Sequence, residues 1–233
     1  WGGFAERGIV TDFWAEKGVR HGTSDHPQQI VPSEIPPHEA TALITLKENL
    51  SCLEHSGIKA GQSLAIVGTG PVARALTACA KLIGISPVVV FGRSKTWQAE
   101  FTQFGADAFV SGHDIPPTAD RVLDDGGFDM VIEAVGSRSA LSKCLEICAA
   151  DGRVNLYGIP PESDPYVNRE ESDSRVFRSE VTESAAHEKI LSAVECGDIM
   201  LADWASHILP WTDFQRGFDL LEHKRAAKVV LVF

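Results

Sequence analysis

The sequence AIVGTGPVARAL, at residues 65–76, has the form of a turn between a buried strand and a helix. Gly68 ends an apolar run, Gly70 lets a ligand approach the backbone, and the small Ala73 replaces the third glycine of a Gly-x-Gly-x-x-Gly pattern. Pro71 suits the first helical position, where its missing N–H costs no hydrogen bond. Because the start of such a helix binds phosphate, the stretch predicts a dinucleotide pyrophosphate site. The alternative is a tight turn that binds nothing.

From Gln62 onward, short apolar runs alternate with helical patterns, as in parallel strands joined by helices. We expect a helix after the glycine turn, ending at Gly84, and others at 97–105, 140–150 and 185–197, with Ser137 capping the one at 140–150. The fold class is therefore α/β, a Rossmann-type doubly wound parallel sheet. Its six expected strands lie within 63–68, 87–91, 106–110, 129–135, 153–159 and 174–181.

The two ends of the chain lack this alternation. Residues 24–40 contain four prolines, which exclude a long helix or a central strand there. The C-terminal part closes with an apolar strand at 227–233, and residues 160–174 are expected to form an exposed acidic loop. We interpret 1–49 and 186–233 as parts of a second domain, separated in sequence by a nucleotide-binding domain at 50–185.

Composition narrows the classes of partner and location. A net charge of -11 argues against nucleic acid and anionic membranes, which require basic surfaces, and leaves a small-molecule substrate. With neither a basic leader nor a long apolar run, a cytoplasmic location is expected. The five cysteines are expected to be reduced thiols, with Cys144 and Cys148 packing on one helical turn in the core instead of binding metal. Because the chain begins at Trp1, we expect a fragment, a processed chain or a trimmed sequence.

The stretch VVVFGRSKT predicts which coenzyme binds. An NAD site has an acidic residue about twenty residues after the glycine turn, where it accepts a hydrogen bond from the ribose 2′-hydroxyl. Gly92 stands at that place, followed by Arg93, Ser94 and Lys95. Removal of the acid makes room for a 2′-phosphate, and Arg93 can bind it through charge-assisted hydrogen bonds. We therefore predict NADP(H) over NAD(H). The alternative is that Arg93 and Lys95 belong to a solvated loop.

Several stretches, in order, resemble the medium-chain dehydrogenase/reductase family, in particular its zinc-dependent alcohol and polyol branch, which includes sorbitol and glucose dehydrogenases. They include SGIKAGQSLAIVGTGPVARAL, FDMVIEAVGSRSAL, GRVNLYGI and HILPWTDFQRGFDLLEHKRAAKVVLVF, and the resemblance extends over about residues 3–233. It implies remnants of a GroES-like, β-rich catalytic domain, a coenzyme in the cleft between the domains, and a homodimer or homotetramer. It also implies that the nicotinamide and its ribose are bordered by Val135, Gly136, Gly158 and Ile159. The resemblance completes the expected coenzyme site, which consists of Gly68, Thr69, Gly70, Pro71, Val72, Gly92, Arg93, Ser94, Lys95 and these four residues.

The resemblance also implies a zinc ion whose ligands precede the GGFAE stretch and are absent from this sequence. One position remains: Glu48, in LITLKENLS, matches the zinc-proximal carboxylate of the polyol branch, with Asn49 in place of its usual proline. An alternative metal cluster would consist of His21, His26, His38 and Glu39, but their spacing matches no known zinc site. We therefore interpret these histidines as solvated loop residues. No role is assigned to the other histidines, and the catalytic residues remain unknown.

These observations predict an oxidoreductase that transfers a hydride between NADP(H) and an alcohol, polyol or sugar-type substrate, with zinc assisting in the complete protein. Two alternatives stay open. One is a shortened, non-catalytic NADP(H)-binding protein with a structural or regulatory role. The other is a zinc-free quinone or enoyl reductase of the same family. The sequence contains no Gly-x-Ser-x-Gly elbow that would indicate a hydrolase.

Overall fold

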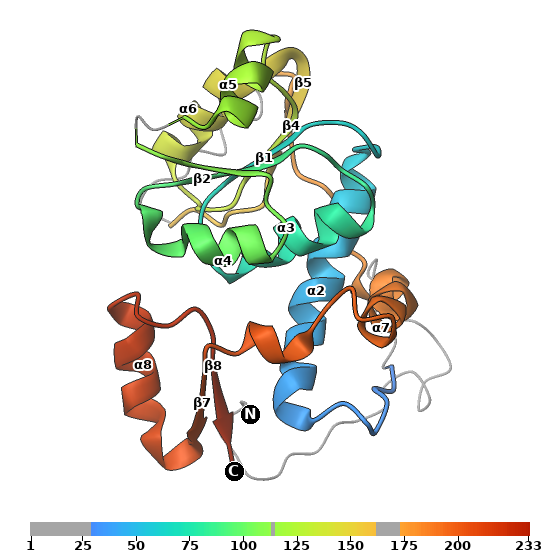
Figure 1. The fold of residues 1–233 in the computed structure, drawn as a ribbon, viewed down its shortest axis with the longest axis vertical. Helices are drawn as coiled ribbons and strands as arrows, with labels where there is room; N and C mark the ends of the chain where they lie inside the picture. The colour runs from blue at the N-terminus through green and yellow to red at the C-terminus, as the bar shows by residue number, and fades with distance from the viewer. Residues whose placement is uncertain (1–28, 113–114, 162–172) are drawn as a thin grey trace. The chain divides into compact units, whose positions relative to one another are not determined.

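The computed structural model describes residues 29–112, 115–161 and 173–233 (Figure 1). The chain divides into two compact units. The sheet unit is Asn49–Val181, and the terminal unit combines the described residues of Trp1–Glu48 with Thr182–Phe233. The sheet unit contains a six-stranded sheet, and the terminal unit contains a two-stranded one.

The sheet unit is built on parallel strands in the order β3-β2-β1-β4-β5-β6. This order confirms the predicted Rossmann-type sheet, because β2 and β3 lie on one side of β1, and β4, β5 and β6 lie on the other. All four residues of β1 are buried, as expected for a strand covered on both faces. The strands are β1 (Leu64–Val67), β2 (Val88–Gly92), β3 (Ala108–Ser111), β4 (Phe128–Glu133), β5 (Cys148–Leu156) and β6 (Val176–Phe177).

Helices cover both faces of this sheet, with α3 and α4 on one face and α5 and α6 on the other (Figure 1). As predicted, α3 ends before Gly84, which has a φ of +75°, and the Ser137 hydroxyl caps α6 by accepting from the Ala140 N–H at 3.2 Å. Helix α5 was not predicted from the sequence. The elements are α3 (Pro71–Leu82), η1 (Lys95–Trp97), α4 (Gln98–Gln103), α5 (Pro117–Asp124) and α6 (Arg138–Ile147).

The cysteine interpretation needs one correction. Cys144 lies on α6, but the helix ends at Ile147 and Cys148 begins β5, so the two do not share a helical turn. Both still pack in the core, with Phe128 and Leu141 among their partners in one buried cluster. All five cysteines are free thiols, and burial raises the pKa of Cys79 well above its ordinary value.

Helix α2 (Pro37–Ser56) is longer than the proline content suggested. It starts at the last of the four prolines, where proline is tolerated, so the exclusion of a long helix fails for the final residues of the stretch 24–40. The boundary between the two units falls within α2, after Glu48. The elements that lie wholly in the terminal unit are η3 (Glu183–Ala186), α7 (His187–Glu195), η4 (Leu201–Trp204), β7 (His207–Pro210), η5 (Trp211–Asp213), α8 (Phe214–Glu222) and β8 (Val229–Val232). Strands β7 and β8 pair in parallel.

An ion pair next to edge strand β6 predicts how stability depends on pH. Arg175 donates to both carboxylate oxygens of Asp173, at 3.1 and 2.9 Å, and these bonds lower the pKa of Asp173 from its ordinary 3.8. Asp173 therefore contributes stability above pH 3.8, and the contribution is lost as the pH falls through the lowered value. Urea unfolding from pH 7 to pH 2 should show Asp173→Asn less stable than the wild type at pH 7, with the two converging in acid.

A matched control for this experiment is the pair Lys143–Glu146, whose carboxylate side chain is 68% exposed. Exposed pairs contribute little, so Glu146→Gln should follow the wild type at every pH. A deficit of Asp173→Asn that stays constant down to pH 2 would show that the substitution acts through packing instead of charge.

Candidate coenzyme-binding site

The residues predicted to bind coenzyme lie along the carboxyl edge of the six-stranded sheet. Parallel pairing sets Val67 opposite both Phe91 and Glu133, and Glu133 is in turn opposite Leu156. The segments that follow these residues therefore leave the sheet at the same edge. They are the glycine turn, the β2–η1 connection and the loops after β4 and β5. The strand order reverses between β1 and β4, which is the point where open α/β sheets bind ligands.

The glycine turn connects β1 to α3, and residues Pro71 and Val72 begin the helix. Gly68 has a φ of +137°, which favours glycine, and a Cβ there would lie 3.0 Å from the carbonyl oxygen of Ala134. A Cβ on Gly70 would meet no atom within 4 Å. Gly70 offers the helix no side-chain cap, and the first turn of α3 has no acidic residue. An anionic phosphate is therefore a suitable partner for the first N–H groups of α3.

Gly92 is enclosed by its neighbours. A Cβ at this position would lie 2.6 Å from Cζ of Phe109 and 2.7 Å from Cγ2 of Thr69. Phe109 is itself held in the core against Phe101, with ring centroids 5.8 Å apart. The side chain of an aspartate or glutamate therefore does not fit at position 92 unless these residues move. Packing therefore disfavours an acidic residue at the position where NAD sites bear one.

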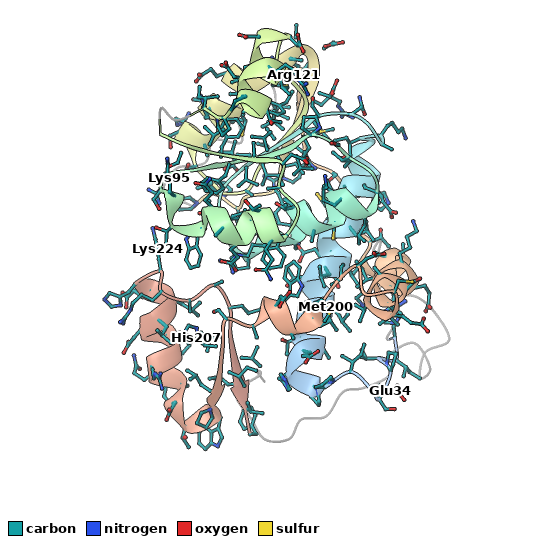
Figure 2. The ribbon with its side chains drawn as sticks, viewed as in Figure 1. Glu34, Lys95, Arg121, Met200, His207 and Lys224 are labelled. Carbon is teal, nitrogen blue, oxygen red and sulfur yellow. The ribbon has the colours of Figure 1, made fainter. Side chains whose placement is uncertain are left out.

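Arg93, Ser94 and Lys95 follow Gly92 and are all exposed. Figure 2 shows Lys95 on the outside of the sheet unit, between β2 and α4. Ser94 lies 3.0 Å from the Thr96 hydroxyl, and among the described residues Arg93 has no hydrogen-bond or ion-pair partner. The connection therefore offers a cation whose donors are available to an anionic ligand.

Arg74, a residue that the sequence analysis missed, supports this connection. Its side chain is 4% exposed, its Nη1 lies 2.8 Å from Oε1 of Glu100, and its guanidinium lies 4.8 Å from the Trp97 ring centroid. Burial lowers the pKa of Arg74, with the Glu100 charge opposing the shift, and burial raises the pKa of Glu100. These contacts hold η1 and α4 against the start of α3. Its sequence signal is an arginine among apolar residues of a helix, which marks the position as unusual without revealing its partners.

The loops after β4 and β5 pack together through two glycines. Gly136 has a φ of +82°, and a Cβ there would collide with the carbonyl group of Ile159. A Cβ on Gly158 would lie 2.5 Å from Oε2 of Glu133 and 2.8 Å from Cα of Gly136. Beside this contact, Val135 is 52% exposed and Ile159 is 86% exposed. The carboxyl edge therefore presents apolar side chains of the kind that line a small-molecule site.

The described residues do not form a zinc site. In residues 29–112, 115–161 and 173–233, no three His, Cys, Asp or Glu side chains lie close enough together to hold a metal ion. Glu48 is half-buried on α2 without a hydrogen-bond or ion-pair partner in the described chain, and its metal role stays a prediction. His38 lies 3.9 Å from Glu39. The remaining histidines of the proposed cluster, His21 and His26, fall outside the described residues.

None of the helices in the described part of the chain combines the length and apolar composition needed to cross a bilayer. The strand order, the glycine turn and the loops at the carboxyl edge define a Rossmann-type α/β unit.

Comparison with known proteins shows which family the chain resembles. A family model described as zinc-binding dehydrogenase matches residues 71–185. L-threonine 3-dehydrogenase of Bacillus velezensis is 26% identical over 210 residues, which cover 86% of this chain and 60% of that protein. The solved structure of alcohol dehydrogenase TADH from Thermus sp. ATN1 matches with a TM-score of 0.71 and 26% identity. The match covers 88% of this chain and 61% of that one. Residues 71–185 thus match the zinc-binding dehydrogenase family, and most of the chain is similar to zinc-type medium-chain dehydrogenases/reductases.

A further solved structure, L-idonate 5-dehydrogenase from Escherichia coli, shares the fold with a TM-score of 0.73 at 22% identity over 87% of this chain and 59% of that one. The chain therefore spans about 60% of the length of these three relatives.

Proposed function

We propose that the carboxyl edge of the sheet unit binds NADP(H), with the pyrophosphate at the start of α3 and the 2′-phosphate against Arg93. The crowding at Gly92 carries the proposal, because the acidic side chain typical of an NAD site would have to displace Phe109 and Thr69. The exposed Arg93 supplies the charge that a 2′-phosphate needs. Val135 and Ile159 would border the nicotinamide, and Gly136 and Gly158 allow their loops to approach each other.

We further propose that this protein is an oxidoreductase acting on an alcohol, polyol or sugar-type substrate. The names of its relatives support this class: one acts on L-threonine, another on L-idonate, and a third is an alcohol dehydrogenase. A bound nicotinamide coenzyme would carry the hydride, and a zinc ion in the complete protein would supply a Lewis acid for the substrate oxygen. The residues of this chain would bind and orient the coenzyme. Oxidation of a panel of alcohols with NADP⁺, together with metal analysis of the active protein, tests this proposal.

Calorimetric titration of the chain with NADPH and NADH tests the coenzyme proposal. NADPH is expected to bind at least about 10-fold more tightly, because a charge-assisted pair with the 2′-phosphate contributes about 1.5–3 kcal/mol. Gly70→Val serves as the control, since its side chain would project into the open space beside the helix start. It should weaken both coenzymes alike, because the pyrophosphate is common to them. Equal affinity for NADPH and NADH in the wild type would contradict the proposal.

A further inference from the structure

Glu133, the last residue of β4, is fully buried at the carboxyl edge of the sheet. Its carboxylate turns back onto the loop that follows. Oε1 accepts hydrogen bonds from the N–H groups of Val135 and Gly136, both at 2.9 Å, and Oε2 lies 3.1 Å from the same Gly136 nitrogen. The side chain therefore fixes the two residues that continue the chain beyond β4.

The backbone of Glu133 fixes the neighbouring loop as well. Its carbonyl oxygen accepts from the N–H groups of Tyr157 at 3.0 Å and Gly158 at 2.8 Å, the first residues after β5. Gly158 lies so close that a Cβ on it would be 2.5 Å from Oε2. One residue thus joins both loops, and the exposed Val135 and Ile159 extend from the segments that it holds.

A buried carboxylate is costly to desolvate, and its burial is tolerated here because backbone N–H groups replace water. If the residue at the end of β4 only filled space, an apolar side chain would stabilise the fold equally well. The carboxylate also affects a neighbouring thiol. The pKa of Cys144 lies well above its ordinary value, chiefly because the thiol is buried and secondly because Glu133 is near.

We propose that Glu133 is a positioning residue for the nicotinamide half of the coenzyme. This inference rests on the proposed NADP(H) site. Glu133 does not touch the coenzyme; it holds the backbone of Val135 and Gly136 and, through its carbonyl, that of Gly158. Loss of its carboxylate should therefore weaken contacts to the nicotinamide half and leave the adenosine half, bound at α3 and the β2–η1 connection, as it was.

Titration of the full chain with NADPH and with adenosine 2′,5′-bisphosphate, which lacks the nicotinamide half, separates these effects. Glu133→Gln keeps one acceptor oxygen and should bind NADPH about 10-fold more weakly, whereas Glu133→Ala loses both oxygens and should bind it more weakly still. Binding of adenosine 2′,5′-bisphosphate should change by less than about 2-fold in both variants. Amide hydrogen exchange should accelerate at Val135 and Gly136.

Asp129→Asn is the matched control, because Asp129 lies near the opposite end of β4 and accepts from the N–H and hydroxyl of Ser63, both at 2.7 Å. This variant should keep the wild-type ratio of the two affinities. Equal weakening of both ligands in Glu133→Gln would mean a general structural role and would overturn the inference, as would unchanged NADPH binding. Failure of the wild type to bind either ligand would instead contradict the proposed coenzyme site itself.

Discussion

Gly158→Ala is expected to lower the free energy of unfolding by about 3 kcal/mol, because the added methyl group has no space and the atoms around it are fixed. Its Cβ would lie 2.5 Å from Oε2 of Glu133 and 2.8 Å from Cα of Gly136, and closer still to the Gly136 nitrogen. Relief requires that the loops after β4 and β5 separate, which breaks the hydrogen bond from the Gly158 N–H to the Glu133 carbonyl. Urea unfolding followed by circular dichroism measures the loss.

Gly70→Ala provides the control for this prediction, since both positions are glycines at the carboxyl edge. A Cβ on Gly70 would meet nothing within 4 Å. Alanine is a poorer N-cap than glycine, but it also restricts the unfolded chain, so the net change should stay below about 1 kcal/mol. If Gly158→Ala proved as stable as Gly70→Ala, the tight packing of the two loops would be refuted.

Arg93→Ala is expected to weaken NADPH binding by about 1.5–3 kcal/mol, or about 10- to 150-fold, and to leave NADH binding unchanged. The physical reason is that Arg93 is proposed to pair with the 2′-phosphate, a group that only NADPH carries. The side chain is exposed and has no hydrogen-bond or ion-pair partner among the described residues, so its removal should leave the fold intact. Calorimetric titration with both coenzymes gives the two affinities directly.

Arg121→Ala is the matched control for the charge. Arg121 is also an exposed arginine of the sheet unit, but it lies on α5, far from Lys95 and the β2–η1 connection in Figure 2. The Arg121→Ala variant should bind NADPH like the wild type, apart from a small long-range electrostatic effect that salt screens. NADPH affinity that is the same in Arg93→Ala and Arg121→Ala would indicate that the connection is a solvated loop.

The sheet was predictable because its signals are local. Each buried parallel strand is a short apolar run, and the glycine turn marks where β1 ends and α3 begins. Prediction failed where local patterns were ambiguous. The apolar residues of 140–150 continue without a break from α6 into β5, so Cys148 was assigned to the helix. Helix α5 is short and begins with a proline, which in sequence resembles a loop.

Some residues of the candidate site were also predictable from the sequence, and others were not. The absence of an acid at Gly92 and the presence of Arg93 are visible in the sequence, and they sufficed to predict the coenzyme. Arg74 and Glu133 escaped notice because a single charged residue in an apolar segment does not reveal what it contacts. Their partners, Glu100 for one and the Gly136 N–H for the other, emerge only when the chain is folded.

By itself the sequence determined the Rossmann-type sheet, the glycine turn between β1 and α3, and the resemblance to the zinc-type dehydrogenases, because these depend on residue type and spacing along one segment. Only the tertiary structure showed that Gly92 is crowded, since Thr69 and Phe109, from two other segments, occupy the space beside it. It also decided that one buried carboxylate fastens the loops after β4 and β5. Both results depend on atoms that parallel strand pairing brings together from distant positions, a proximity that no local pattern encodes.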